Sequence, residues 1–124
     1  MKIPSPPVNP ENKAFFDAAR EGRFMLGTCT TCQAVHYYPR AACPFCGGKT
    51  ELIPAKGNGT LYSYSVMRRV ADPYAIAYVT LDEGVTVLTN LVDCDLDRLR
   101  IGSAVRLVFK AAEGGEMIPM FTPA

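Results

Sequence analysis

A chain of 124 residues has room for one domain, or for one small domain with an appended module. Its net charge is +1, which argues against a dedicated nucleic-acid-binding protein because such proteins usually carry a clear basic excess. Apolar residues make up 48% of the chain, enough for a packed core, but no apolar run approaches the roughly 20 residues that span a bilayer. We therefore expect a globular protein without a transmembrane segment.

The first predicted element is a helix within NPENKAFFDAAREG, residues 9–22. Asn9 can cap this helix, Pro10 suits its first position, and Gly22 can end it.

The N-terminal sequence MKIPSPPVNPENK contains no hydrophobic signal core, which favours a cytoplasmic protein. Because thiols stay reduced in the cytoplasm, clustered cysteines there are expected to bind metal rather than to form disulfides.

The segment CTTCQAVHYYPRAACPFCGG, residues 29–48, holds four of the five cysteines as two Cys-x-x-Cys pairs. Each pair forms a tight turn that points two thiolates at one ion, and two such turns complete the tetrahedron that structural zinc prefers. Few large aliphatic side chains lie in this segment, so metal binding would stabilise it in place of a core. The pattern predicts a zinc ribbon with one zinc, whose ligands would be Cys29, Cys32, Cys43 and Cys46.

Other interpretations of these residues remain open. Four thiolates also suit a rubredoxin-like iron site, and four buried cysteines without metal are a further alternative. Redox-active disulfides are disfavoured because no βαβ pattern accompanies the pairs.

His36 is the only histidine. We expect it to be solvated in a loop rather than a ligand. Cys94, beside two aspartates, is expected to be small, buried and inert.

Short strands are predicted on each side of the ribbon, in RFMLGTC and in TELIPA. From Thr60 onward the pattern becomes β, and Gly84 suits the left-handed position of a DEG hairpin. DLDRLRIG would form one helical turn. In the first of these later strands, Tyr62, Tyr64 and Val66 are expected on one face and Leu61, Ser63 and Ser65 on the other. Five β segments predict a small closed barrel of the OB-fold type: TLYSYSVMRRV, YAIAYVTL, VTVLTNLV, SAVRLVF and EMIPMF.

The fold class is therefore mainly β, with an N-terminal helix and a zinc ribbon followed by a five-stranded OB-fold barrel. Residues 1–26 would form the helical segment and its lead-in strand. Residues 27–54 would form the ribbon, and residues 55–124 the barrel.

No catalytic set is visible in the sequence. It contains no Gly-x-Ser-x-Gly, phosphate-binding glycine-rich loop or HExxH motif. Asp82 and Glu83 are expected to be solvated in a hairpin rather than to act as an acid–base pair. Three basic residues near the barrel are candidate ligands for a phosphate or carboxylate, although exposed arginines are common: Lys56, Arg68 and Arg69.

The order of these parts resembles the DUF35 family. The resemblance rests on the ribbon, on GNGTLYSYSVMRRV, on PYAIAYVTLDEGVTVLTNLV with its Leu-Asp-Glu-Gly hairpin, and on the IPMFTP ending. It implies an OB-fold protein with a rubredoxin-like zinc ribbon, associated with acyl-CoA metabolism, in which the four cysteines carry the zinc. It also implies an accessory role beside thiolase-fold enzymes, and sometimes MaoC-type hydratases, in lipid, sterol or polyketide pathways. It transfers no catalytic residue.

Three functions compete at this point. The first is a non-catalytic partner of a thiolase-like enzyme, with or without direct contact to CoA. Its candidate anchors are the aromatic residues Phe15, Phe16 and Tyr37, although packing onto the protein's own core is the more common use of an aromatic pair such as Phe15 and Phe16. The second is an OB-fold protein that binds single-stranded nucleic acid, with Tyr62, Tyr64 and Tyr78 as stacking platforms. The near-neutral charge weakens that reading. The third is a stand-alone acyl-CoA-binding protein.

Overall fold

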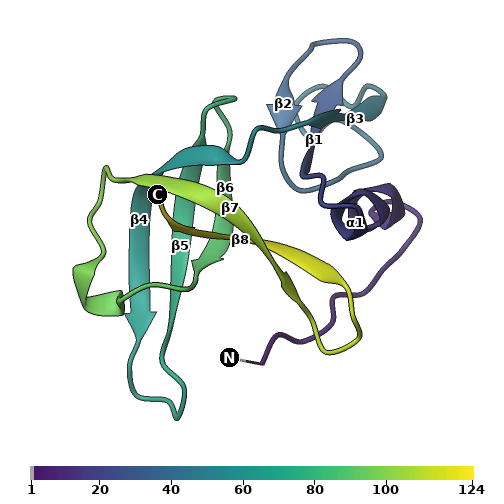
Figure 1. Ribbon diagram of the computed structural model, residues 1–124. Helices are drawn as coiled ribbons and strands as arrows, with labels where there is room; N and C mark the ends of the chain where they lie inside the picture. The colour runs from purple at the N-terminus through teal and green to yellow at the C-terminus, as the bar shows by residue number, and fades with distance from the viewer. Residues whose placement is uncertain (1) are drawn as a thin grey trace.

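The computed structural model describes residues 2–124 (Figure 1). Its elements follow the chain as α1 (Lys13–Arg20), β1 (Met25–Cys29), β2 (Val35–His36), β3 (Thr50–Pro54), β4 (Asn58–Met67), β5 (Tyr74–Leu81), β6 (Thr86–Leu91), η1 (Leu96–Arg98, a 3₁₀ turn), β7 (Ala104–Ala111) and β8 (Met117–Pro123). A three-stranded sheet in the order β2-β1-β3 carries the cysteine segment, and β4-β5-β6-β8-β7 close into a barrel. The predicted helix, ribbon and five-stranded barrel are thus confirmed.

Gly22 lies just past the C-terminal end of α1, where the sequence predicts a helix-ending glycine. Gly22 has φ +80°, the left-handed conformation that glycine adopts without steric cost. Its N–H reaches the carbonyl of Ala19 at 2.9 Å, and the next N–H, from Arg23, reaches Ala18 at 2.9 Å. These two bonds satisfy carbonyls that the end of a helix leaves free. At the other end α1 begins at Lys13 after Asn12, so the expectation that Asn9 caps the helix and Pro10 is its first residue is wrong. Asn9 instead accepts two backbone N–H groups at 3.0 Å in the turn that leads into α1.

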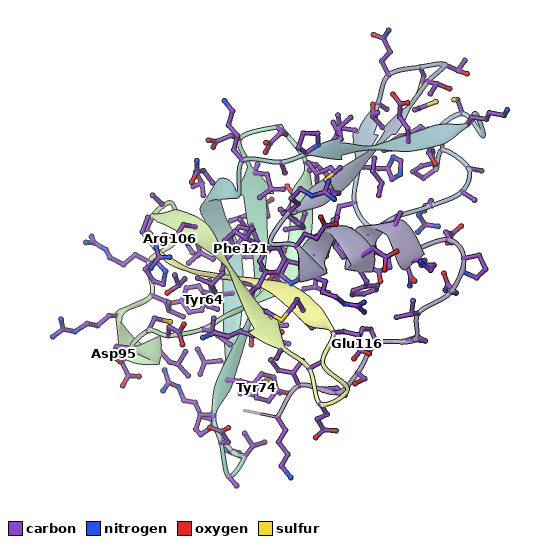
Figure 2. All side chains as sticks on the ribbon, turned by 45° about the vertical axis from the view of Figure 1, so that its right-hand side comes forward. Tyr64, Tyr74, Asp95, Arg106, Glu116 and Phe121 are labelled. Atoms are coloured by element: carbon purple, nitrogen blue, oxygen red, sulfur yellow. The ribbon has the colours of Figure 1, made fainter. Side chains whose placement is uncertain are left out.

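One aromatic cluster joins the helix, the ribbon and the barrel. Phe15 of α1 and Phe24, just before β1, have ring centroids 6.3 Å apart, and Phe24 lies 6.3 Å from Phe121 of β8. In Figure 1 the helix lies beside β8, and Figure 2 shows Phe121 on the side of the barrel that faces the helix. Ribbon and barrel therefore share one hydrophobic core through α1.

This cluster corrects the expectation of exposed aromatic anchors. Phe15 is 1% exposed and Phe16 5% exposed, because both rings pack inward from α1. Tyr37 is half-buried and lies 5.9 Å from the rings of both Phe15 and Phe24. Burial raises the pKa of the Tyr37 phenol. A partner protein has little access to these side chains.

Strand β4 contains a β-bulge that the sequence pattern does not reveal. Its register against β5 shifts between Leu61 and Ser63, which leaves Tyr62 as an extra residue. Because of this extra residue, the side chains after the bulge point to the opposite faces from those that a regular alternation starting at Leu61 would give them. Leu61, 1% exposed, lies on the inner face together with Tyr64 and Val66, each opposite a buried residue of β5. The prediction that Leu61 shares a face with Ser63 is wrong for this reason.

The predicted turns form where expected. Gly84 adopts φ +93° in the β5–β6 hairpin. In the same hairpin Glu83 accepts the backbone N–H of Lys56 at 2.8 Å, which ties the hairpin to the segment before β4. Asp95 caps η1, and Gly102 with φ +88° ends the connection to β7. Among residues 2–124, no helix has the length and apolar character required to cross a membrane.

Candidate metal centre

The four paired cysteines meet at one point of the ribbon. Their Sγ atoms all lie within 4.8 Å of one another. Two of the Sγ–Sγ distances join the two turns, 3.5 Å from Cys29 to Cys46 and 3.7 Å from Cys32 to Cys43. A tetrahedral ion with metal–sulfur bonds of about 2.3 Å would place its sulfur ligands about 3.8 Å apart. The cluster therefore has the size and donor set of a four-thiolate metal site.

The first turn, or knuckle, directs backbone N–H groups at a sulfur. The N–H groups of Thr31 and Cys32 each lie 3.3 Å from the Sγ of Cys29, at the end of β1. Gly48 passes close by, where an added Cβ would lie 3.0 Å from that Sγ and 2.9 Å from the Thr31 hydroxyl. Only a residue without a side chain fits there unless its neighbours move, which explains one glycine of the CPFCGG sequence.

The second knuckle repeats this arrangement. The N–H of Phe45 lies 3.4 Å from the Sγ of Cys43. Gly47 has φ +77° and donates its N–H to the Cys43 carbonyl at 2.9 Å, which closes the turn. The side chain of Phe45 points outward and is 71% exposed. Because N–H groups stabilise thiolates, both knuckles favour the deprotonated ligands that a metal requires.

The electrostatics of the cluster call for a cation. The backbone N–H of Cys32 is the main cause that lowers the pKa of the Cys29 thiol to about 6, against the opposing effect of burial. The pKa of Cys32 rises instead, to about 12. Its largest single influence, the N–H of Ala34, lowers it, but the neighbouring sulfurs of Cys46 and Cys29 and burial together outweigh that N–H. Without a positive ion, these sulfurs cannot all be thiolates at neutral pH.

His36 departs from its expected solvated loop. It lies in β2, is 4% exposed, and neither ring nitrogen has a hydrogen-bond partner among residues 2–124. Burial, and secondarily the charge of Arg40, lower the pKa of its imidazole, so the neutral ring is favoured. The ring packs directly against Gly27 of β1, where an added Cβ would lie 2.2 Å from Nε2. A solvated loop histidine was the wrong expectation because β2 pairs with β1 and turns this side chain inward.

Replacing Gly27 with alanine is expected to destabilise the ribbon by about 1–3 kcal/mol, because the added methyl group displaces the His36 ring. Urea unfolding measures this loss. In the double variant Gly27→Ala/His36→Ala, the second change removes the clash, so the double variant should lose less than the sum of the two single losses. Equal unfolding midpoints for Gly27→Ala and the unaltered protein would contradict this packing.

The three candidate basic residues are not brought together. Lys56 precedes β4 and Arg68 follows it, so a strand of ten residues, about 33 Å long at about 3.3 Å per residue, separates them. Arg68 forms an ion pair of 2.8 Å with Asp97 of η1, and both side chains are more than half exposed. Arg69 is exposed in the β4–β5 connection. No single anion contacts both ends of this strand.

Two further residues stand apart from the cluster. Cys94 is half-buried, and burial, followed by the charges of Asp93 and Asp95, raises the pKa of its thiol, in line with the expected inert cysteine. His36 makes no hydrogen bond to a nucleophile within residues 2–124. The described residues thus offer a metal cluster and no histidine-based catalytic pair.

Comparison with known proteins assigns both the ribbon and the barrel to known domain families. Residues 16–52 match the family model described as "ChsH2, rubredoxin-like zinc ribbon domain", and residues 52–110 match "ChsH2, C-terminal OB-fold domain". A solved structure described as "Ltp2-ChsH2(DUF35) aldolase" superposes with a TM-score of 0.85 and 33% identity, over 96% of this chain and 98% of the other. A DUF35 protein of Sulfolobus solfataricus, with 14% identity and a TM-score of 0.68, shares the fold.

Curated relatives point the same way. A "Probable enoyl-CoA hydratase alpha subunit" of Thermomonospora curvata is 34% identical over 98% of this chain, although the chain spans only 40% of that relative's length. A "DUF35 domain-containing scaffold protein" of Methanothermobacter thermautotrophicus is 40% identical over 71% of this chain and 73% of its own length. Taken with the ribbon and the barrel, these matches show that the chain belongs to the DUF35 family of OB-fold proteins with a rubredoxin-like zinc ribbon.

Proposed function

We propose that this chain is a non-catalytic accessory subunit that assembles with an acyl-CoA enzyme of the thiolase-fold or hydratase type. The observation that carries the proposal is the close likeness, along nearly its whole length, to a DUF35 chain solved in a complex named as an aldolase. The relatives named as a scaffold protein and as a hydratase subunit support the same assignment.

A non-catalytic role agrees with the chemistry of the chain. Acyl transfer needs a nucleophile with a positioned base, and hydration needs an acid–base pair near the substrate. His36, the one histidine of the sequence, is buried with no hydrogen-bond partner among residues 2–124, and the half-buried thiol of Cys94 has a raised pKa. Catalysis is therefore assigned to the partner enzyme.

We further propose that the metal is zinc and that its role is structural. Four cysteine ligands fill a tetrahedral site and leave no position for water or substrate, which is the usual arrangement of structural zinc. The ion would stabilise the two knuckles, which have little apolar core of their own. Because the ligands must stay reduced, a cytoplasmic location is proposed as well.

The assembly is tested by mixing the purified chain with the thiolase-fold or hydratase enzyme encoded nearest to it. We expect co-elution in size-exclusion chromatography at the summed mass, and no turnover of acyl-CoA by the chain alone. Separate elution together with unchanged enzyme activity would refute the accessory role. Turnover of acyl-CoA by the chain alone at an enzymatic rate would refute the non-catalytic assignment.

A further inference from the structure

The outer side of three adjacent barrel strands carries no charged residue. The register aligns outward positions in rows across β4, β5 and β6. Eight such positions form what we call the uncharged face: Ser63, Ser65, Ile76, Tyr78, Thr80, Thr86, Leu88 and Asn90. Their alternate neighbours on β5 and β6, such as Val79 and Val87, point inward and are buried.

Large apolar side chains lie open to solvent at the centre of this face. Tyr78 and Leu88 stand directly opposite each other and are 48% and 55% exposed, with Ile76 beside them at 38%. Together with Ser63 and Ser65 these side chains line a shallow groove of about 350 Å³. Exposed apolar side chains that gather in one patch, rather than being scattered singly, mark a surface that another molecule covers.

Other parts of the outer side of the barrel do carry charged residues. On β7 the outward positions include Arg106 and Lys110, and Figure 2 shows Arg106 at the edge of the barrel. Lys110 forms an ion pair of 2.6 Å with Asp93. Strand β8 also lacks charge, but its residues 119–122 are buried. The uncharged barrel surface that is open to solvent therefore lies on β4, β5 and β6.

The chemistry of this face favours a protein over a nucleic acid. Strands of an OB-fold barrel often bind oligonucleotides, but a nucleic acid needs lysine or arginine near its phosphates, and the eight positions supply none. The central part of a protein interface is instead depleted of charge and enriched in tyrosine. Tyr78 with Leu88 and Ile76 fits that composition.

The margin of the uncharged face carries charges of both signs. Arg69 follows β4, and Arg100 lies in the turn whose Gly102 donates an N–H to Leu61 of β4 at 2.8 Å. Both arginines are exposed, and so is Asp82 in the β5–β6 hairpin. A complementary partner surface has an uncharged apolar centre and charged groups of both signs at its edge, because opposed potentials fix the register of two surfaces.

We propose that the partner enzyme docks on the uncharged face of β4, β5 and β6 through an apolar surface edged by charged groups of both signs. The inference rests on the proposed function and names the surface of this chain that performs it. It replaces Phe15, Phe16 and Tyr37, which belong to the core, with Tyr78 and Leu88 as the central contacts.

The test uses the enzyme that co-purifies with the tagged full-length chain and is identified by mass spectrometry as thiolase-fold or hydratase. Two variants, Leu88→Glu and Tyr78→Glu, place a carboxylate in the centre of the face at exposed positions, where folding tolerates it. We expect each variant to bind the enzyme about 30-fold more weakly or worse, as for the loss of a central interface residue. Circular dichroism and metal content should remain those of the unaltered chain.

Phe45→Glu is the matched control, because Phe45 is a still more exposed aromatic residue on the ribbon. Its affinity for the enzyme should stay within about twofold of the unaltered value. Equal binding by the Leu88→Glu and unaltered chains would overturn the docking surface and leave the accessory role intact. Failure of the unaltered chain to retain any such enzyme would overturn both proposals. A homodimer that Leu88→Glu dissociates, or single-stranded DNA binding that Tyr78→Glu abolishes, would assign the face to another occupant and also overturn the inference.

Discussion

Replacement of Cys43 by serine is expected to abolish stoichiometric metal binding and to unfold the ribbon. A serine hydroxyl at neutral pH is a poor substitute for a thiolate, and the remaining sulfurs cannot complete a tetrahedron. Structural zinc supplies on the order of 10 kcal/mol to small modules of this kind, so most of the stability of the two knuckles is lost with it. Because Phe24 and Tyr37 join the ribbon to the shared core, the loss should also lower the unfolding temperature of the barrel.

Elemental analysis and thermal unfolding measure the two effects. The unaltered chain should contain about one zinc per chain, and Cys43→Ser much less than half of that. Cys94→Ser is the matched control, since Cys94 is a half-buried thiol outside the cluster, and it should keep its metal. Freshly purified, reduced protein without metal would overturn the assignment, as would a Cys43→Ser chain that keeps a full equivalent of zinc.

Replacement of Phe15 by alanine is expected to cost about 3–5 kcal/mol of unfolding free energy. Phe15 is 1% exposed, and its ring contacts those of Phe16, Phe24 and Tyr37 at centroid distances of 5.2, 6.3 and 5.9 Å. The alanine leaves a cavity where helix, ribbon and barrel meet, so no single unit can relax to fill it.

Urea unfolding followed by circular dichroism gives the free energy directly. Tyr62→Ala is the control: this aromatic residue is 66% exposed at the β4 bulge, and its removal should change stability by less than about 0.5 kcal/mol. If Phe15→Ala and Tyr62→Ala unfold at the same urea concentration, the shared core does not hold the three parts together as described.

Features fixed by neighbouring residues could be predicted from the sequence. The Cys-x-x-Cys turns determine their own geometry, so spacing alone was enough to bring Cys29 and Cys43 into one cluster. Gly22 and Gly84 were recognisable because few residues other than glycine adopt the left-handed conformation at a helix end or in a three-residue hairpin. The five strands of the barrel followed from turn signals between β-branched runs, whereas their order β4-β5-β6-β8-β7 did not.

Features that depend on distant parts of the chain could not be predicted. His36 reads as a loop residue because β2 has only two residues, and its burial comes from pairing with β1. For Phe15 and Phe16 the sequence favours packing in the core over a role as anchors, and the packing of α1 against β8 decides between the two. The bulge at Tyr62 cannot be recognised in the sequence of β4. It changes the face to which each side chain points, but it does not change which residues are apolar.

The closure of the barrel rests on a narrow seam. Strands β7 and β8 share seven register pairs, whereas β6 and β8 share one parallel pair, Leu91 with Phe121, supported by the N–H of Val92 on the Phe121 carbonyl at 2.9 Å. The side chain of Phe121 also contacts Phe24 in the aromatic cluster. The residue that completes the barrel is therefore fixed in place from the ribbon side. We therefore expect metal binding at the cysteine cluster to lower how often the barrel opens along this seam, although none of the four cysteines belongs to a barrel strand.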